Sequence, residues 1–177
     1  MNYSPLQQDF CAKDRIYYYK MKNNRSYCIV VDADACPVKS EIIQAGKQFG
    51  VPVLMVASHD HQLTDEAGVK VQYVDRSDQS ADLYISNYLR KGDILITQDF
   101  GLAAIGLAKQ AIVLSMRGQV YTDRTIDFLL ERRHAHAKHR RGGGKHKGPK
   151  AMTNEDKMTF LQTLTTILQN LQELRHN

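Results

Sequence analysis

Short apolar runs alternate along the chain with segments whose apolar residues recur at helical spacing. The first run lies in residues 27–37, YCIVVDADACP, and stops at two aspartates, Asp32 and Asp34. Four further runs follow, at Val51–Ala57, Val69–Val74, Ile94–Thr97 and Ala111–Ser115. Short runs rich in Val and Ile that end in polar residues are typical of buried parallel strands. The pattern therefore predicts five strands.

Segments with helical spacing fill the intervals between these strands. The predicted helices span Val38–Phe49, Ser80–Leu89, Leu102–Lys109, Asp123 to about Arg133 and Asn154–Leu174. This alternation predicts an α/β fold with a mainly parallel open sheet and helices on both faces. Right-handed crossovers favour the strand order 3-2-1-4-5, in which the first and fourth strands are neighbours.

The last predicted helix has an apolar stripe formed by Met158, Leu161, Leu164, Ile167, Leu168 and Leu171. Because such a stripe is normally buried, this helix is expected either to dock on the domain or to pair with another copy of the chain in a homo-oligomer.

The length of 177 residues suits one domain with extensions. Residues 1–26 are polar, lack periodicity and are predicted to be peripheral, and Met21 is an alternative start of translation. Residues 27–133 are expected to form the α/β domain. Residues 134–152 then form a basic, Gly-rich linker, and residues 153–177 contain the C-terminal amphipathic helix.

Three aspartates from separate segments are expected at one edge of the sheet. Asp32 ends the first strand, Asp99 follows the fourth, and Asp82 lies in the helix between them. Neighbouring parallel strands are about 4.8 Å apart, so Asp32 and Asp99 would face one another at a distance that one cation can bridge. Carboxylates suit a hard cation such as Mg²⁺ or Mn²⁺, with Asp82 as a third ligand. The alternative is that a lone aspartate only caps the following helix.

The net charge of +5 is concentrated in one segment. Residues 131–150 contain eight Lys or Arg against one Glu, four histidines and the run Gly142–Gly144. This segment therefore carries +7 and the rest of the chain −2. Such a composition suits a polyanion such as nucleic acid, although a solvated surface explains it equally well.

Other features limit the function classes. The cysteines Cys11, Cys28 and Cys36 form no paired framework, which favours a reducing cytoplasm, and Cys28 is expected in the core. No apolar run reaches the roughly 18 residues of a membrane span, so no membrane association is expected. His59 and His61 are expected to be surface residues.

The sequence VDADA also fits the acidic motif of haloacid-dehalogenase-like phosphatases. In that superfamily the first aspartate is a nucleophile and the second a general acid, and Lys91-Gly92-Asp93 superficially matches the later acidic pair. That pair follows its strand in those enzymes, whereas Gly92-Asp93 precedes one here. The phosphatase therefore remains a minor alternative.

Several motifs together, VDADACP, SADLYI, GDILITQDFGLA, SMRG and GGGKHKGP, resemble the YaiI/YqxD family of uncharacterised proteins. This resemblance implies a PIN-like fold and a Mg²⁺- or Mn²⁺-dependent nuclease acting on RNA. It places catalysis on Asp32, Asp82 and Asp99, with Asp34 as a fourth metal ligand. It also marks Cys36, Thr97, Arg117 and Gly118 as positions of the family pattern.

Nucleic-acid contacts are expected from basic residues in or near the linker, namely Arg117, Arg140, Arg141, Lys145, Lys147 and Lys150. Three functions thus remain open: a metal-dependent nuclease, a non-catalytic nucleic-acid-binding protein with a structural acidic cluster, and a small-molecule phosphatase.

Overall fold

The computed structural model of the chain describes residues 27–58, 67–75, 80–131 and 150–176. The elements are β1 (Ile29–Asp32), α2 (Lys39–Phe49), β2 (Val53–Ser58), β3 (Val69–Val74), α3 (Ser80–Tyr88), β4 (Ile94–Ile96), α4 (Phe100–Ala108), β5 (Ile112–Leu114), β6 (Val120–Tyr121) and α6 (Asn154–His176). Residues 123–131 are also helical. The N-terminal extension, the two loop histidines and most of the basic linker lie outside the described residues.

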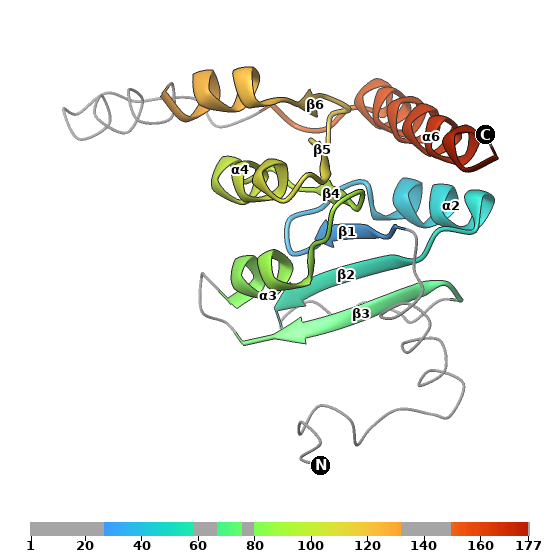
Figure 1. The fold of residues 1–177 in the computed structure, drawn as a ribbon, viewed down its shortest axis with the longest axis horizontal. Coiled ribbons are helices and arrows are strands. Elements are labelled where there is room, and N and C mark those ends of the chain that lie inside the picture. The colour runs from blue at the N-terminus through green and yellow to red at the C-terminus, as the bar shows by residue number, and fades with distance from the viewer. Residues whose placement is uncertain (1–26, 59–66, 76–79, 132–149, 177) are drawn as a thin grey trace, which may run out of the picture.

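The six strands form one sheet in the order β3-β2-β1-β4-β5-β6 (Figure 1). The first five are parallel, and β6 pairs antiparallel with β5. The prediction of a mainly parallel open α/β sheet is therefore confirmed, including the central position of β1 beside β4. The short strand β6 was not predicted, because two residues after a turn give no recognisable period.

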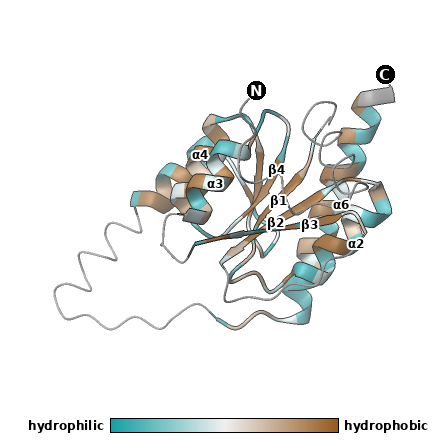
Figure 2. Cartoon of the chain, turned by 90° about the horizontal axis from the view of Figure 1, so that it is seen from below, coloured by the Kyte–Doolittle hydropathy of each residue, from teal (hydrophilic) through white to brown (hydrophobic). Residues whose placement is uncertain are grey.

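Helices cover both faces of this sheet, α3 and α4 on one side and α2 and α6 on the other (Figure 2). Alternate residues of each strand point to opposite faces. Ile29, Val31 and Ile96 accordingly pack with α2 and α6, whereas Val30 and Leu95 pack with α3, α4 and the helix at 123–131. Cys28 is fully buried in the second layer, as expected of a core residue.

The C-terminal helix α6 docks on its own domain, beside α2 (Figure 1). Its buried side chains are Phe160, Leu164 and Leu168, which complete the core on that face. The side-chain Nε2 of Gln172 also donates a hydrogen bond of 3.0 Å to the carbonyl of Phe49 at the end of α2.

The expected stripe on α6 needs one correction. Met158 is 72% exposed, because at 3.6 residues per turn it lies roughly on the opposite side of the helix from Phe160, which faces the core. Phe160 takes the buried position instead, since it is one turn before Leu164 and two turns before Leu168 and shares their face.

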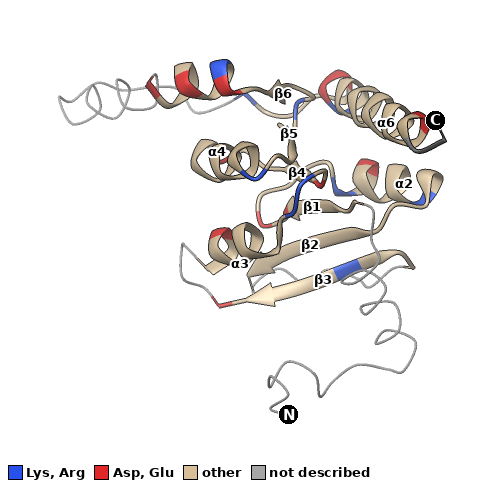
Figure 3. Cartoon of the chain, viewed as in Figure 1, with Lys and Arg blue, Asp and Glu red and all other residues tan. Residues whose placement is uncertain are grey.

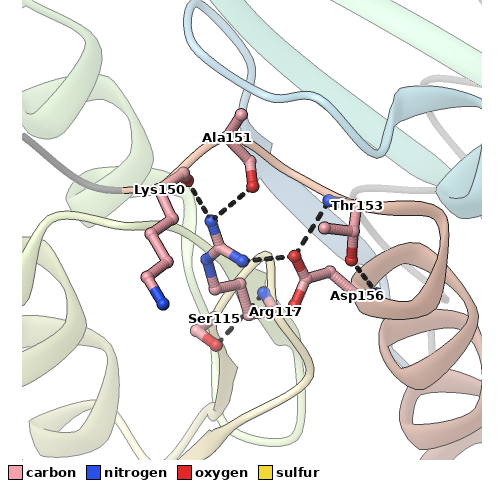
Figure 4. A network of polar contacts seen from close by, with 6 residues as sticks. All are labelled: Ser115, Arg117, Lys150, Ala151, Thr153 and Asp156. Carbon is pink, nitrogen blue, oxygen red and sulfur yellow. Dashed lines mark hydrogen bonds and ion pairs between the residues drawn. The ribbon is translucent and has the colours of Figure 1, made fainter.

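The turn between β5 and β6 holds the first turns of α6 in place (Figure 4). The Arg117 guanidinium forms an ion pair with Asp156 and donates hydrogen bonds to the carbonyls of Lys150 and Ala151. Asp156 and Thr153 also cap the helix reciprocally, since each accepts a hydrogen bond from the backbone N–H of the other. The basic segment thus ends at a point fixed by Arg117.

Gly118 allows this turn to approach α6 closely. Its φ is +83°, and a Cβ there would lie 3.1 Å from the carbonyl oxygen of Thr159 and 3.2 Å from Cα of Phe160. Both atoms belong to the helix backbone, which cannot rotate away. Only glycine therefore combines this backbone conformation with this contact.

We predict that Gly118→Ala destabilises the protein more than Gly92→Ala. Gly92 has the same φ of +83°, but a Cβ there would meet nothing within 4 Å. Gly92→Ala should therefore cost only the backbone strain, about 1 kcal/mol, whereas Gly118→Ala should cost roughly 1–3 kcal/mol more because α6 must shift. Urea unfolding measures both losses, and equal losses would show that the turn does not hold α6.

Candidate functional site

The carboxyl ends of β1 and β4 bring Asp32 and Thr97 together. Val31 pairs with Ile96, so the next residues of the two strands, Asp32 and Thr97, lie level with each other. By the alternation of strand side chains, both point to the face that α3 and α4 cover. The hydroxyl of Thr97 donates a hydrogen bond of 3.0 Å to Oδ2 of Asp32.

Asp99 joins this pair as the N-cap of α4. Its Oδ1 accepts a hydrogen bond of 2.9 Å from the backbone N–H of Leu102. Its own backbone N–H donates to the Thr97 hydroxyl at 3.0 Å. Gly101 leaves room for this arrangement, because a Cβ there would lie 3.0 Å from Oδ1 of Asp99. Asp99 is thus both a helix cap and a member of the acidic group.

Asp82 supplies the third carboxylate from the first turn of α3. No hydrogen-bond or ion-pair partner of its side chain lies among the described residues. Burial raises the pKa of Asp82, and the negative charge of Asp99 raises it further. The two carboxylates therefore interact electrostatically across the gap between α3 and α4.

The pKa of Asp32 reports the same crowding of negative charge. Burial raises it most, the hydrogen bond from Thr97 opposes that rise, and the charges of Asp82, Asp34 and Asp99 raise it further. Figure 3 shows acidic positions after β1 and at the start of α3, at the same end of the sheet. We refer to Asp32, Asp34, Asp82 and Asp99 as the acidic cluster.

Asp34 also has a structural contact. Its Oδ1 accepts hydrogen bonds from the backbone N–H of Ser58 at 2.7 Å and from the Ser58 hydroxyl at 3.1 Å. Because Ser58 is the last residue of β2, Asp34 fixes the loop after β1 to the neighbouring strand. The negative charge of Asp34 helps to raise the pKa of Asp32. Its Oδ1, however, already accepts the two hydrogen bonds from Ser58.

The cluster suits a divalent cation by its donor type more than by its spacing. Its donors are carboxylate oxygens, as Mg²⁺ and Mn²⁺ prefer, and Oδ1 of Asp32 has no hydrogen-bond partner among the described residues. Within those residues, however, no three acidic, His or Cys side chains are close enough to hold one ion. Binding of one ion by three of these carboxylates would therefore require their side chains to lie closer together than they do in this structure.

Asp93 occupies the opposite edge of the sheet and has a structural role. It is 1% exposed, and its two oxygens accept hydrogen bonds from the backbone N–H groups of Cys28 and Arg90, both at 2.9 Å. It lies before β4, whereas Asp32 lies at the end of β1. Asp93 is therefore unsuited to be the second acidic position of a phosphatase site at Asp32.

Of the six basic residues predicted to contact nucleic acid, the structure describes two. The Arg117 guanidinium is occupied by the α6 contacts (Figure 4), and Lys150 is exposed at the end of the basic segment. The other four predicted contacts, Arg140, Arg141, Lys145 and Lys147, lie outside the described residues.

Three contributors to the site were missed or given no role at the sequence level. Ser58 is the polar residue that ends a buried strand at the carboxyl edge, and this position could have marked it as a site residue. Gly101 directly follows the helix start, where an absent side chain leaves space for a cap. Thr97 was marked only as a family-pattern position, because sequence alone does not show which partners a hydroxyl takes.

Cys36 is a further family-pattern position near the cluster. The structure buries it, and burial raises the pKa of its thiol to about 11. A thiol with that pKa stays protonated near neutral pH, so Cys36 is suited to packing and poorly suited to nucleophilic attack.

Comparison with known proteins gives one consistent group of relatives. A family model described as "Uncharacterized BCR, YaiI/YqxD family" matches residues 30–170. A "UPF0178 protein" of Bacillus pumilus is 49% identical over 143 residues, which cover 80% of this chain and 86% of the relative. One from Listeria monocytogenes is 47% identical over 142 residues, covering 80% and 95%. No solved structure matches the chain.

Within the described ranges, no helix combines the length and the apolar character that crossing a membrane requires.

We predict that Asp82→Asn slightly stabilises the protein in the presence of a chelator. Because its folded pKa lies above the unfolded 3.8, the folded state binds the proton more tightly, and this contribution to stability is lost as pH rises above 3.8. Near neutral pH the variant should gain about a few tenths of a kcal/mol, a small effect because the side chain is only partly buried and solvent screens its charge. Thermal unfolding measures this gain, which should shrink toward acid pH.

In excess Mn²⁺ the wild type should be more stable than Asp82→Asn, since a cation bound only by the folded wild type stabilises it by mass action. Asp99→Asn should lose the Mn²⁺ response while keeping the helix cap, because Asn is also a good N-cap. Asp127→Asn, which removes an exposed charge from the helix at 123–131, is the matched control and should respond to Mn²⁺ like the wild type. Equal Mn²⁺ shifts in all four proteins would contradict a site at this cluster.

Proposed function

The chain belongs to the YaiI/YqxD family, and we propose that it is a divalent-metal-dependent nuclease acting on RNA. The observation that carries this proposal is the acidic cluster itself. Asp32, Asp82 and Asp99 come from separate segments at the carboxyl edge of the sheet, where burial first, and then the charges of Asp82, Asp34 and Asp99, raise the pKa of Asp32. Open α/β sheets bind ligands at this edge.

The repulsion within the cluster favours a cation over purely structural roles. Asp34 and Asp99 have hydrogen bonds that explain their positions, to Ser58 at the end of β2 and to the N–H of Leu102 in α4. Asp82 has no such partner among the described residues, yet it lies where its charge is unfavourable. A carboxylate with a raised pKa and no hydrogen-bond partner among the described residues is a candidate for a functional residue.

The roles of the residues follow from their positions. Asp32 and Asp99 would hold a divalent cation from the sheet and from the start of α4, and Asp82 would complete the site from α3. A bound Mg²⁺ or Mn²⁺ supplies charge neutralisation and polarises a phosphoryl oxygen toward attack by water. Asp34 would support the site by holding the loop after β1 against Ser58.

The basic segment supports a polyanionic substrate. An acidic cluster alone repels a phosphate backbone, so attraction must come from elsewhere on the chain. The segment at 131–150 carries +7, and its last residues are held by Arg117, which follows β5. Because β5 is the neighbour of β4, that attachment point lies at the same carboxyl edge as Asp99. We therefore expect Arg140, Arg141, Lys145, Lys147 and Lys150 to contact RNA phosphates.

A non-catalytic nucleic-acid-binding protein is the second candidate, because the basic segment favours it equally. The two candidates differ in whether the acidic cluster is needed for chemistry. The phosphatase is the weaker alternative, since Asp93 is buried at the opposite edge of the sheet.

We predict that Asp32→Asn lowers cleavage of single-stranded RNA by roughly 100-fold or more, because one holding carboxylate is lost. RNA binding should remain or tighten, since removing a negative charge reduces repulsion of the phosphate backbone. The measurements are RNA cleavage with Mn²⁺ and with chelator, and RNA affinity in chelator.

Two further variants separate the alternatives. Asp34→Asn preserves an oxygen acceptor for Ser58 and should retain most RNA cleavage, whereas a phosphatase acting through Asp32 and Asp34 would lose release of phosphate from a chromogenic monoester. Glutamine at Arg140, Arg141, Lys145 and Lys147 should weaken binding and flatten its dependence on salt, by roughly 0.7 in logarithmic slope for each lost phosphate contact. Cleavage that survives chelation or Asp32→Asn would contradict the nuclease, and tight binding without cleavage would favour the binding protein.

A further inference from the structure

The amino ends of β4 and β5 lie beside a second concentration of charge, and this one is positive. α3 ends at Tyr88 and α4 at Ala108, and basic residues follow each helix. These residues are Arg90 and Lys91 after α3 and Lys109 after α4, and all three are exposed. Figure 3 shows basic positions in the segment that joins α3 to β4. We refer to Arg90, Lys91 and Lys109 as the basic patch.

A backbone hydrogen bond holds the two segments of the basic patch together. The backbone N–H of Gly92 donates to the carbonyl of Gln110 at 3.0 Å. Because Lys91 precedes Gly92 and Lys109 precedes Gln110, the two lysines start from neighbouring points of the joined backbones. The patch is therefore built from segments that the fold holds side by side, although they are far apart in the sequence.

The acid within these two segments does not neutralise the patch. It is Asp93, which is 1% exposed and whose two carboxylate oxygens accept hydrogen bonds from backbone N–H groups. Lys91 and Lys109 form no ion pair with any residue that the structure describes. Exposed cations that are held together without an acidic neighbour attract an anionic partner.

The face between the basic patch and the acidic cluster carries no charge of its own. α3 has no charged residue after Asp82, and α4 has none at all. These two helices cover the face toward which Asp32 points (Figure 2). β1 has four residues, which at roughly 3.3 Å each place the two edges about 13 Å apart. A phosphate backbone can therefore extend from one edge to the other without meeting an acidic side chain of α3 or α4 on the way.

We propose that the basic patch is a second contact surface for single-stranded RNA, at which Arg90, Lys91 and Lys109 bind phosphates of the strand. This inference rests on the proposed function for the identity of the polyanion, but it requires no bound metal. Contacts of this kind position the strand and increase its affinity without reading its sequence.

The alternative is that these residues only stabilise the helices that they follow. A cation at the C-terminus of a helix interacts favourably with the helix dipole, and Arg90 and Lys109 lie at such ends. That role predicts a loss of stability on substitution and no change in RNA binding. RNA affinity therefore separates the two roles.

The first measurement is the affinity of the full-length chain for a single-stranded RNA, determined by fluorescence anisotropy in chelator at several salt concentrations. The test variant combines Arg90→Gln, Lys91→Gln and Lys109→Gln. Each lost phosphate contact should lower the logarithmic salt slope by roughly 0.7, which at about 0.1 M salt corresponds to about fivefold in affinity. The triple variant should therefore bind RNA at least about tenfold more weakly than the wild type.

The matched control combines Lys39→Gln, Arg124→Gln and Lys157→Gln, which removes the same charge from α2, the helix at 123–131 and α6. This control should keep more of the affinity and more of the salt slope than the test variant. Equal losses in the two triple variants would overturn the proposal, because only the net charge would then matter. Wild-type affinity in the test variant would overturn it as well.

A second measurement locates the contact on the wild-type chain. Saturating RNA should protect Lys91 and Lys109 from a lysine-acetylating reagent, as read by mass spectrometry, and should leave Lys39 reactive. If the triple variant does not fold, Lys91→Glu tests the same surface and should bind RNA at least about fivefold more weakly. Unprotected Lys91 and Lys109 would overturn this inference while leaving RNA binding elsewhere on the chain intact. No RNA binding by the wild type would overturn the proposed function and, with it, this role of the basic patch.

Discussion

The structure of the candidate site depends on the register of β1 against β4. Because Val31 pairs with Ile96, Asp32 and Thr97 are level and point toward α3 and α4. A slip of one residue would turn Asp32 toward the apolar layer under α2 and α6. Burying an unpaired carboxylate there would cost several kcal/mol. The packing of the two core layers therefore enforces the register that assembles the acidic cluster.

The two faces of the sheet have different roles: one is packed against apolar helices, and the other carries the residues proposed to bind a cation. The face covered by α2 and α6 is apolar, and it extends to Gly118, where the turn after β5 contacts α6. The face covered by α3 and α4 carries the cluster at one end. Arg117, one of the residues expected to contact nucleic acid, forms an ion pair with Asp156 and a hydrogen bond to the carbonyl of Lys150 before α6. Along the chain, the basic segment follows the helix at 123–131 and precedes α6, and both of these helices pack on the sheet.

Much of the fold was predictable because buried parallel strands have a strong sequence signal. The five parallel strands and the order of the central ones followed from apolar runs and crossover rules, and so did the edge that holds Asp32 and Asp99. The strand β6, the exposure of Met158 and the burial of Phe160 were missed, because they depend on where α6 docks. The contacts of Ser58 and Thr97 were also missed, since hydrogen-bond partners distant in sequence leave no periodic pattern.

Every role that we propose for the acidic cluster requires it to bind one divalent cation. The most direct test is a crystal structure of the protein grown with Mn²⁺, with anomalous scattering used to locate the ion. We expect one strong anomalous peak in contact with carboxylate oxygens of Asp32, Asp82 and Asp99. A structure without a peak at this position would contradict a metal site at the acidic cluster.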